Sequence, residues 1–434
     1  MGKIKVAWIT SFSDSRVRKH LPISKSLLER FLRWITGTSE NFVPADYAVW
    51  ISNGIEEMEK FSEVELHIIS PCDYLSTERV DYIEKGINYH FFKNEVRSLW
   101  FKVREKLKCR SVYDYKENKK HISEYINSIK PDIIHLIGAE NIYYSLSVLD
   151  IPKSIPIIVQ LQTLISDADF RNNYMLSEHL YNIRSLGEQK VIRRSDFVGT
   201  RAQYFIKIIK GTFSKDSVFL RTTLPLSEII NKREDEKKYD FVYFAKDIQK
   251  SADYAIEAFA LAAKQKPGIT LDIVGDYSPE YKELLDSRLN ELGITDNVHF
   301  EGKLPTHDDV LRQIRLSRFA VLPMKIDLIT GTVRESMANG IPVVTTITPA
   351  SPILNAKRES VLLSEKGDFQ AMADNMLRLL RDKDFADRIR ENALITAEER
   401  ESNQEIVSQW VRAYYACFDN FRNGTPIPED LLNK

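Results

Sequence analysis

Cysteine is scarce in this 434-residue sequence, and its three cysteines, Cys72, Cys109 and Cys417, stand far apart. None belongs to a Cys-x-x-Cys pair or to a cysteine–histidine cluster with the spacing of metal ligands. The sequence therefore predicts neither a disulfide framework nor a structural zinc. Such cysteine usage is typical of a reducing compartment, so we expect a cytoplasmic protein.

Long apolar runs and an excess of one charge are also missing. The longest apolar stretches have about six to eight residues, which is too short to cross a bilayer. The N-terminal MGKIKVAWIT has no long apolar segment followed by a small-residue cleavage site, and we expect a first strand there. Lys and Arg number 61 against 62 Asp and Glu, and this balance favours no nucleic-acid partner.

Four common catalytic signatures are absent. No GxGxxG follows the expected first strand, and the sequence contains no GxxxxGK[ST], GxSxG or HExxH. These absences argue against a standard dinucleotide oxidoreductase, a P-loop phosphotransferase, a nucleophile-elbow hydrolase and a zinc protease. An enzyme built on this sequence would work mainly by positioning and electrostatics.

What is present is an alternation of β-rich runs with helical stretches. Twelve runs are expected as strands: 5–10, 65–70, 132–138, 155–162, 195–200, 217–222, 239–245, 270–276, 297–302, 318–324, 341–346 and 360–365. Near-continuous apolar strands separated by helices indicate an α/β protein with parallel sheets covered on both faces. The length of the chain favours two domains.

The charged stretch NKREDEKK at 231–238 interrupts this alternation and reads as a linker or exposed turn. We therefore expect domains at 1–228 and 229–404, followed by a helix at 405–434 that packs back toward the N-terminal domain. Two doubly wound, Rossmann-like domains facing a cleft would bind ligands beyond the carboxyl ends of their strands.

The stretch KIDLITGTVRESMANGIPVVTT at 325–346 has two interpretations. Gly331 and Thr332 precede an expected helix, and the amides and dipole at the start of a helix bind anions such as a diphosphate. Thr332 and Glu335 also have the spacing of a capping box, in which Glu335 would only satisfy the helix start.

Two lysines, Lys246 and Lys250, follow the first expected strand of the C-terminal domain. They stand four residues apart at the end of that strand where ligands bind, so they would neutralise a diphosphate opposite Gly331. The alternative is an ordinary solvated loop.

The order of segments from 239 to about 400 resembles the retaining nucleotide-sugar glycosyltransferases of the GT-B fold, in glycosyltransferase family four. The order is a strand, the lysine pair, a helix, LDIVGD, DNVHFEG, AVLPM, an acidic loop and ESMANGIPVVTT. The resemblance implies a nucleotide-sugar donor bound by the C-terminal domain and no cofactor or metal at the site of transfer.

The resemblance also implies roles for individual residues. Lys246, Lys250, Gly331 and Thr332 would bind the donor diphosphate, while Gly302 and Leu304 would line the nucleobase pocket. Of the family's two acids, Glu335 would bind the donor ribose and Asp327 would support the positive charge developing on the donor sugar. This sequence departs from the family pattern at Ala245, Ser251, Asp327 and Leu328, and it has Lys246 where the family usually has arginine.

In the N-terminal half, PDIIHLIGAEN at 131–141 looks like the family's loop that faces the sugar and the acceptor. His135, Gly138 and Glu140 are the residues expected to face them, although the second histidine of the common His-x-His form is Ile137 here. A histidine in such a strand is also commonly a core residue.

Residues 93–120 carry ten basic and four acidic residues. Within 97–110, Trp100, Val103 and Leu107 would share one helical face beside basic residues, an arrangement that suits peripheral contact with the inner face of a membrane. A solvated basic helix packed by Trp100 is the alternative.

Together these features predict a retaining hexosyltransferase that uses a nucleoside-diphosphate sugar and a saccharide or lipid-linked glycan acceptor, as in cell-surface polysaccharide biosynthesis. A second hypothesis is a catalytically degenerate GT-B protein that binds a nucleotide or a glycan without turnover.

Overall fold

The structure is a computed structural model, and it describes residues 2–23, 45–107, 110–167, 170, 177–213, 217–226, 236–247, 251–325 and 331–433. The chain divides into two compact units. The N-terminal unit comprises 1–43, 48–225 and 402–434, and the C-terminal unit comprises 44–47 and 226–401. The sequence predicts domain boundaries after residues 228 and 404. In the structure the chain passes from one unit to the other after Pro225 and after Glu401. Of the expected linker, residues 231–235 lie outside the described residues.

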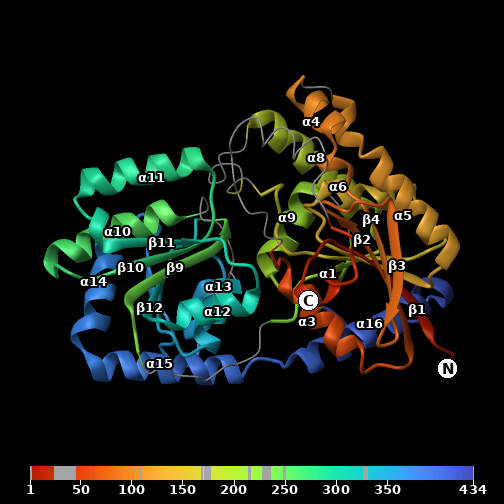
Figure 1. The fold of residues 1–434 in the computed structure, drawn as a ribbon. Helices are drawn as coiled ribbons and strands as arrows, with labels where there is room; N and C mark the ends of the chain where they lie inside the picture. The colour runs from red at the N-terminus through yellow and green to blue at the C-terminus, as the bar shows by residue number, and fades with distance from the viewer. Residues whose placement is uncertain are drawn as a thin grey trace. The chain divides into compact units, whose positions relative to one another are not determined.

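The N-terminal unit, which carries β1 to β4 in Figure 1, contains a sheet. Its described strands follow the order β3-β4-β2-β1-β5-β6-β7-β8. These strands are β1 Ile4–Ile9, β2 Val64–Cys72, β3 Arg79–Glu84, β4 Ile87–Lys93, β5 Ile133–Ile137, β6 Ile157–Gln160, β7 Phe197–Gly199 and β8 Val218–Leu220. Neighbouring strands run parallel except for β3, which pairs with β4 in the antiparallel sense. The six runs expected as strands in this half are all strands of this sheet.

The hairpin formed by β3 and β4 is an addition that the sequence patterns did not predict. Its two strands are joined by Lys85 and Gly86, whose φ angles are +49° and +82°. A two-residue turn with both φ angles positive matches the right-handed twist of the strands, and glycine favours its second position.

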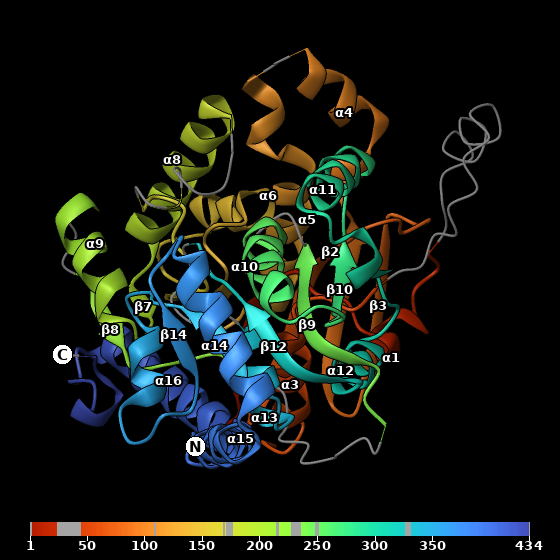
Figure 2. The same ribbon diagram turned by 90° about the vertical axis from the view of Figure 1, so that its left-hand side faces the viewer.

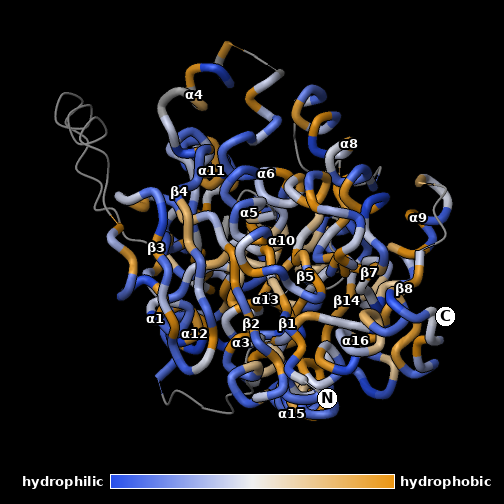
Figure 3. Tube along the Cα trace, turned by 90° about the vertical axis from the view of Figure 1, so that its right-hand side faces the viewer, coloured by the Kyte–Doolittle hydropathy of each residue, from blue (hydrophilic) through white to orange (hydrophobic). Residues whose placement is uncertain are grey.

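Helices of the N-terminal unit surround this sheet, and the last of them comes from the end of the chain. They are α1 Ser15–Arg18, α3 Val49–Met58, α4 Leu99–Lys106, α5 Lys116–Ile129, α6 Ile142–Ser145, α8 Glu178–Arg194, α9 Gln203–Phe213 and α16 Asn403–Asn423. Hydrophobic residues gather on the inner strands, whereas the helices alternate between hydrophobic and hydrophilic positions (Figure 3). No described helix combines the length and the apolarity needed to cross a membrane.

Helix α16 completes the core of the N-terminal unit. Trp410 and Tyr414 are each 1% exposed and belong to the same buried cluster as Trp8 of β1. The indole Nε1 of Trp8 donates a hydrogen bond of 2.9 Å to the Tyr414 hydroxyl. Removing α16 would therefore expose large apolar side chains of the central strand.

The C-terminal unit is built on a parallel sheet with the order β11-β10-β9-β12-β13-β14 in the described residues (Figure 2). Its strands are β9 Tyr239–Asp247, β10 Leu271–Asp276, β11 Val298–Gly302, β12 Ser317–Leu322, β13 Val343–Thr346 and β14 Leu362–Ser364. Its helices are α10 Ala252–Gln265, α11 Pro279–Leu292, α12 His307–Arg315, α13 Gly331–Ala338, α14 Phe369–Arg381 and α15 Lys383–Glu398. The order changes direction at β9 and β12, where a doubly wound sheet binds its ligands.

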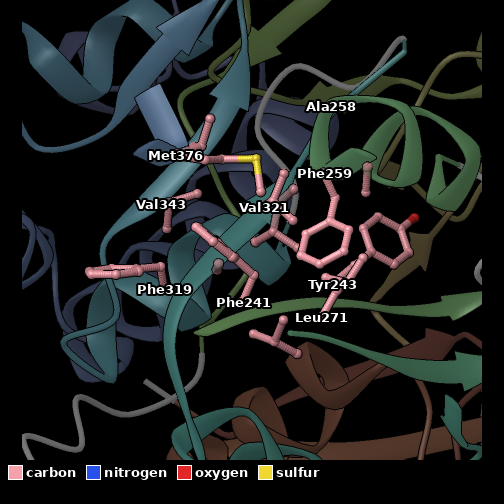
Figure 4. Packing of buried hydrophobic residues seen from close by; sticks show 14 of the residues in the cluster. Phe241, Tyr243, Ala258, Phe259, Leu271, Phe319, Val321, Val343 and Met376 are labelled. Atoms are coloured by element: carbon pink, nitrogen blue, oxygen red, sulfur yellow. The ribbon is translucent and has the colours of Figure 1, made fainter. Parts of the chain in front are cut away.

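The core of this unit packs the sheet against its helices (Figure 4). Phe241 of β9 lies 5.7 Å from the ring of Phe319 on β12 and 6.4 Å from that of Phe259 on α10. Val343 and Met376 extend the same cluster to β13 and α14. Each such side chain contributes about 1.5–3 kcal/mol through burial, so this packing stabilises the scaffold that carries the strand ends.

Candidate active site

The chain leaving β12 is held in place by two threonines of β13. The Thr346 hydroxyl accepts a hydrogen bond of 2.8 Å from the backbone N–H of Met324 and donates one of 2.6 Å to the Met324 carbonyl. The Thr345 hydroxyl donates to the carbonyl of Leu322 at 2.7 Å. Both threonines are 0% exposed. Thr345 and Thr346 therefore fix the backbone direction in which the chain leaves β12 toward the acidic loop.

Lys325, the next residue, is tied to the start of α10. Its Nζ lies 2.9 and 2.8 Å from the two carboxylate oxygens of Asp253 and 4.4 Å from the ring centre of Tyr254. The lysine side chain is 15% exposed and that of Asp253 is 39% exposed, so solvent reaches this ion pair from the aspartate side. The patterns did not predict this contact, which joins the chain after β12 to the start of α10 across 72 residues.

Within the described residues α13 spans Gly331–Ala338, so Thr332 lies inside the helix and does not precede it. The capping-box interpretation required Thr332 to be the residue before the helix, and the structure does not show that register. Gly331 is exposed, and a Cβ added there would meet Glu335 Oε1 at 3.9 Å among the described atoms. A ligand can therefore approach the backbone at this helix start closely.

Glu335 lies in the second turn of α13 beside His307, the first residue of α12. Its Oε1 is 3.5 Å from His307 Nε2, and the two side chains are 17% and 18% exposed. The backbone N–H of His307 donates to Asp46 Oδ2 at 3.0 Å, which explains why residues 44–47 belong to this unit. His307 was missed by sequence reasoning because nothing in its local pattern links it to a helix that begins at Gly331.

The segment expected to line the nucleobase pocket follows the edge strand β11. Gly302 has φ of +79°, and a Cβ added there would lie 3.7 Å from the hydroxyl of Tyr277, which follows the neighbouring strand β10. Leu304 packs partly buried against the core. Lys303 forms an ion pair of 3.0 Å with Asp276. A left-handed glycine beside a tyrosine leaves backbone and an aromatic ring available to a flat ligand.

Three of the expected donor-site residues are described only in part or not at all. Asp327 and Lys250 lie outside the described residues. Lys246 is placed on β9, but its side chain is not described. The structure therefore brings Gly331, Thr332 and Glu335 together on α13, and it places Lys246 at the carboxyl end of a strand that pairs with β12.

His135 is a core residue, which corrects the hypothesis that it faces the acceptor. It is 2% exposed, and its Nδ1 lies 2.7 Å from the hydroxyl of Tyr414. Its ring packs edge-on against Trp8 and Trp410. Burial lowers the pKa of His135 to about 3, so the ring is neutral. The sequence could not separate a strand histidine of the core from one at a strand end.

The loop after β5 has a conformation that only glycine adopts easily. Gly138 has φ of +95°, and a Cβ added there would lie 2.6 Å from the hydroxyl of Tyr144. That hydroxyl donates a hydrogen bond of 2.6 Å to the carbonyl of Ile137. It also accepts one of 3.2 Å from Asn141 Nδ2. Gly138 therefore allows the backbone conformation of this loop, which also carries Glu140.

Glu140 is a buried carboxyl at the carboxyl end of the N-terminal sheet. Glu140 is 5% exposed. Its Oε1 accepts a hydrogen bond of 2.8 Å from Asn141 Nδ2, while its Oε2 has no partner among the described residues. Burial raises the pKa of Glu140 to about 8, and the charge of Glu188 contributes in the same direction. At neutral pH the group is largely protonated and can donate as well as accept.

Glu188 of α8 is a second buried acid, and it was not predicted. Its two carboxylate oxygens accept from the backbone N–H groups of Ile165 and Ser166 at 2.9 and 2.7 Å. Burial raises the pKa of Glu188 to about 7. Its role is structural, because it accepts hydrogen bonds from backbone N–H groups of the loop that follows β6.

Comparison with known proteins gives the family of the C-terminal unit. Residues 227–395 match the family model for glycosyl transferases group 1. The N-acetyl-alpha-D-glucosaminyl L-malate synthase of Bacillus anthracis is 29% identical over 169 residues, which are 39% of this chain and 43% of that protein. The chain thus matches less than half the length of this curated relative.

Solved structures extend the likeness to both units. Sucrose-phosphate synthase from Thermosynechococcus elongatus covers 96% of this chain and 99% of its own, with a TM-score of 0.70 and 13% identity. HepE from Anabaena, solved with UDP and glucose, covers 95% and 100%, with a TM-score of 0.60 and 12% identity. At such identities the likeness concerns the fold. The chain therefore has the GT-B fold, and its C-terminal unit belongs to the group 1 glycosyl transferases.

Proposed function

We propose that this protein is a retaining hexosyltransferase that moves a sugar from a nucleoside diphosphate to a saccharide or lipid-linked glycan of the cell-surface polysaccharide type. One observation carries the proposal. Gly331, Thr332 and Glu335 occupy the first turns of α13, at the start of the helix that follows β12, inside the segment that matches the family. The solved relative HepE, which has the same fold, was crystallised with UDP and glucose.

The departing diphosphate is the group that this site would stabilise. The start of α13 brings the positive end of a helix dipole to the end of the sheet where ligands bind. Lys246 and Lys250 would add two positive charges after β9. These groups act on charge that grows as the glycosidic bond breaks, so they favour the transition state over the bound donor.

Asp327 would stand near the donor sugar and stabilise the positive charge on its anomeric carbon. Glu335, oriented by His307, would bind the donor ribose. Because the cations and the helix dipole balance the diphosphate, the transfer step would need no metal and no cofactor.

In the N-terminal unit, Gly138 and Glu140 would serve the acceptor side. The Oε2 of Glu140, which has no partner among the described residues, would gain one from a sugar hydroxyl. His135 has no place in this proposal, because it packs against Trp8 and Trp410 in the core.

The site assignment is tested by Lys250→Ala and Glu335→Ala, each of which should lower transfer by more than about 100-fold. Lys264→Ala is the matched control, since Lys264 lies in the last turn of α10, far along the helix from its start. Circular dichroism checks that each variant is folded. Full activity in both site variants refutes the assignment, and an inverted anomeric centre in the product, read by NMR, refutes retention.

A second candidate is a GT-B protein that binds a nucleotide or glycan without turnover. The observation that favours it is the set of departures from the family pattern, at Ala245, Asp327, Leu328 and Ile137. Calorimetric titration with UDP and GDP sugars, followed by transfer and hydrolysis assays, separates the two. Binding without turnover toward any acceptor supports this second candidate, whereas transfer excludes it.

We also propose peripheral contact of a cytoplasmic protein with an anionic membrane through residues 97–110. Phe101 of α4 is 6% exposed and anchors the helix, whereas Val103 and Leu107 are 39% and 70% exposed. Exposed apolar residues in a segment whose sequence also carries Lys102, Lys106 and Arg110 suit an anionic surface. Vesicle co-sedimentation should be lost when those three basic residues are changed to Glu. Equal sedimentation of both proteins, or of neither, contradicts the proposal.

A further inference from the structure

A buried carboxylate, Asp272, lies within the C-terminal sheet with one oxygen unpaired. Asp272 is the second residue of β10 and is 0% exposed. Its Oδ2 accepts a hydrogen bond of 2.8 Å from Gln313 Nε2 on α12, but its Oδ1 has no partner among the described residues. Burying a carboxylate without partners for both oxygens is costly, so this position favours a bound cation.

Two more ligand groups come from the neighbouring edge strand β11. Asp272 pairs in register with His299, so in this parallel pair their side chains share one face of the sheet. The register then shifts, which leaves Glu301 as an extra residue before Gly302. Such a bulge re-aims a side chain. One ligand atom from each of Asp272, His299 and Glu301 lies within 4.8 Å of the other two.

The spacing of these atoms fits a small metal ion. His299 Nε2 and Glu301 Oε2 are 3.2 Å apart. With bonds of about 2.0–2.1 Å, the ligands of tetrahedral zinc stand about 3.3–3.4 Å from each other. The pair is therefore already near the spacing of two zinc ligands, and the ligand atom of Asp272 lies within 4.8 Å of both. One imidazole nitrogen and two carboxylate oxygens suit zinc and similar divalent transition metals.

We propose that Asp272, His299 and Glu301 bind a divalent transition-metal ion of the zinc type, with water as the fourth ligand. Gln313 orients Asp272 from α12, and the ring of Tyr239 on β9 stacks on His299 at 5.6 Å. The ion would join the edge strand β11 to β10. It would act on stability, because Asp272 stands near the amino end of β10 and the donor site lies beyond the carboxyl ends.

This inference is independent of the proposed transfer reaction. It also differs from the prediction of no structural zinc, which depended on cysteine spacing, whereas this site uses no cysteine. The sequence gives little sign of it, because Asp272 stands 27 positions before His299 and only the His-x-Glu pair is local.

Calorimetric titration of the full chain with zinc chloride, after removal of metals by a chelator and dialysis, tests the site. The wild type should bind one equivalent, and His299→Gln should weaken binding by more than about 100-fold, since even outer-shell partners are worth about 10–100-fold. Zinc should raise the melting temperature of the wild type and not that of the variant. Because the His299 side chain is 49% exposed, the substitution leaves the core intact.

His20→Gln is the matched control. His20 Nε2 lies 3.3 Å from Glu84 Oε1, and its ring stacks on Tyr82 at 4.5 Å. It therefore repeats the histidine–glutamate pair, and no third ligand group joins it among the described residues. This variant should bind zinc as the wild type does. No zinc binding by the wild type, or equal binding by the wild type and His299→Gln, overturns the proposal.

Discussion

At the scale of single residues, Gly138 offers a direct test of the loop after β5. Gly138→Ala should destabilise the protein by about 1–3 kcal/mol, because alanine disfavours a positive φ and its Cβ would displace Tyr144. Gly211→Ala is the control: Gly211 lies in α9 with open space around it, so alanine should stabilise by about 0.5–1 kcal/mol. Urea unfolding measures both. Equal changes in the two variants would show that the loop tolerates a side chain.

Glu140 should make stability depend on pH. Its pKa rises from 4.5 to about 8 on folding, so the protonated form is favoured in the folded state. The stability that this group contributes is full below about pH 4.5 and is lost as pH rises through 8. Glu140→Gln stays neutral, so its free energy of unfolding relative to wild type should increase by at least about 1 kcal/mol between pH 5 and pH 8. Urea titrations at both pH values give the difference, and a constant difference contradicts the prediction.

Glu188→Gln is the contrasting variant. Both carboxylate oxygens of Glu188 accept backbone N–H groups, so a glutamine NH2 would face one of these donors. It should therefore cost about 1–3 kcal/mol at pH 5. Burial raises the pKa of Glu188 to about 7, so the wild type loses stability as pH rises and this cost should shrink toward pH 8.

The positions of residues in helices and strands were predictable only where the chain is locally patterned. A helix could be predicted in the stretch that carries Gly331 and Glu335, but the local pattern predicts its start after Thr332, whereas Gly331 and Thr332 both lie within α13. The ion pair of Lys325 with Asp253 and the neighbourhood of His135 depend on residues far away in the chain. The local sequence around Lys325 or His135 does not show which distant residue each of them contacts.

At the scale of elements, the exit from β12 depends on Thr346. Thr346→Val removes the acceptor for the N–H of Met324 and should destabilise by about 1–3 kcal/mol. It should also raise the KM for donor, because the acidic loop begins at this point. Thr345→Val leaves no N–H without a partner, since Thr345 only donates to Leu322, and it should change KM less. Thermal unfolding and initial rates compare the two, and an equal KM change would contradict this ordering.

The strands were the most predictable elements, because buried parallel strands are continuous apolar runs. The hairpin β3–β4 escaped prediction for a related reason. Its outer strand alternates exposed and half-buried residues, and its turn is Lys85–Gly86 in place of the common Asn-Gly.

At the scale of the whole molecule, the two units should differ in their ability to fold alone. A fragment of residues 226–401 contains every described strand and helix of its unit and should unfold cooperatively. Residues 1–225 lack α16, with Trp410 and Tyr414 of the core, and should not fold. Joining 402–434 to 1–225 through a flexible linker should restore folding. Thermal melts followed by circular dichroism decide this, and a cooperative melt of 1–225 alone contradicts it.

The return of α16 to the first sheet also sets an order of events on the ribosome. Residues 226–401 are synthesised before α16, so the second unit can complete its core while the first still lacks a helix. The first unit must then wait, with Trp8 uncovered, until residues 402–423 have left the exit tunnel. Nascent chains stalled before α16 should therefore engage chaperones through the first unit, although that unit was made first.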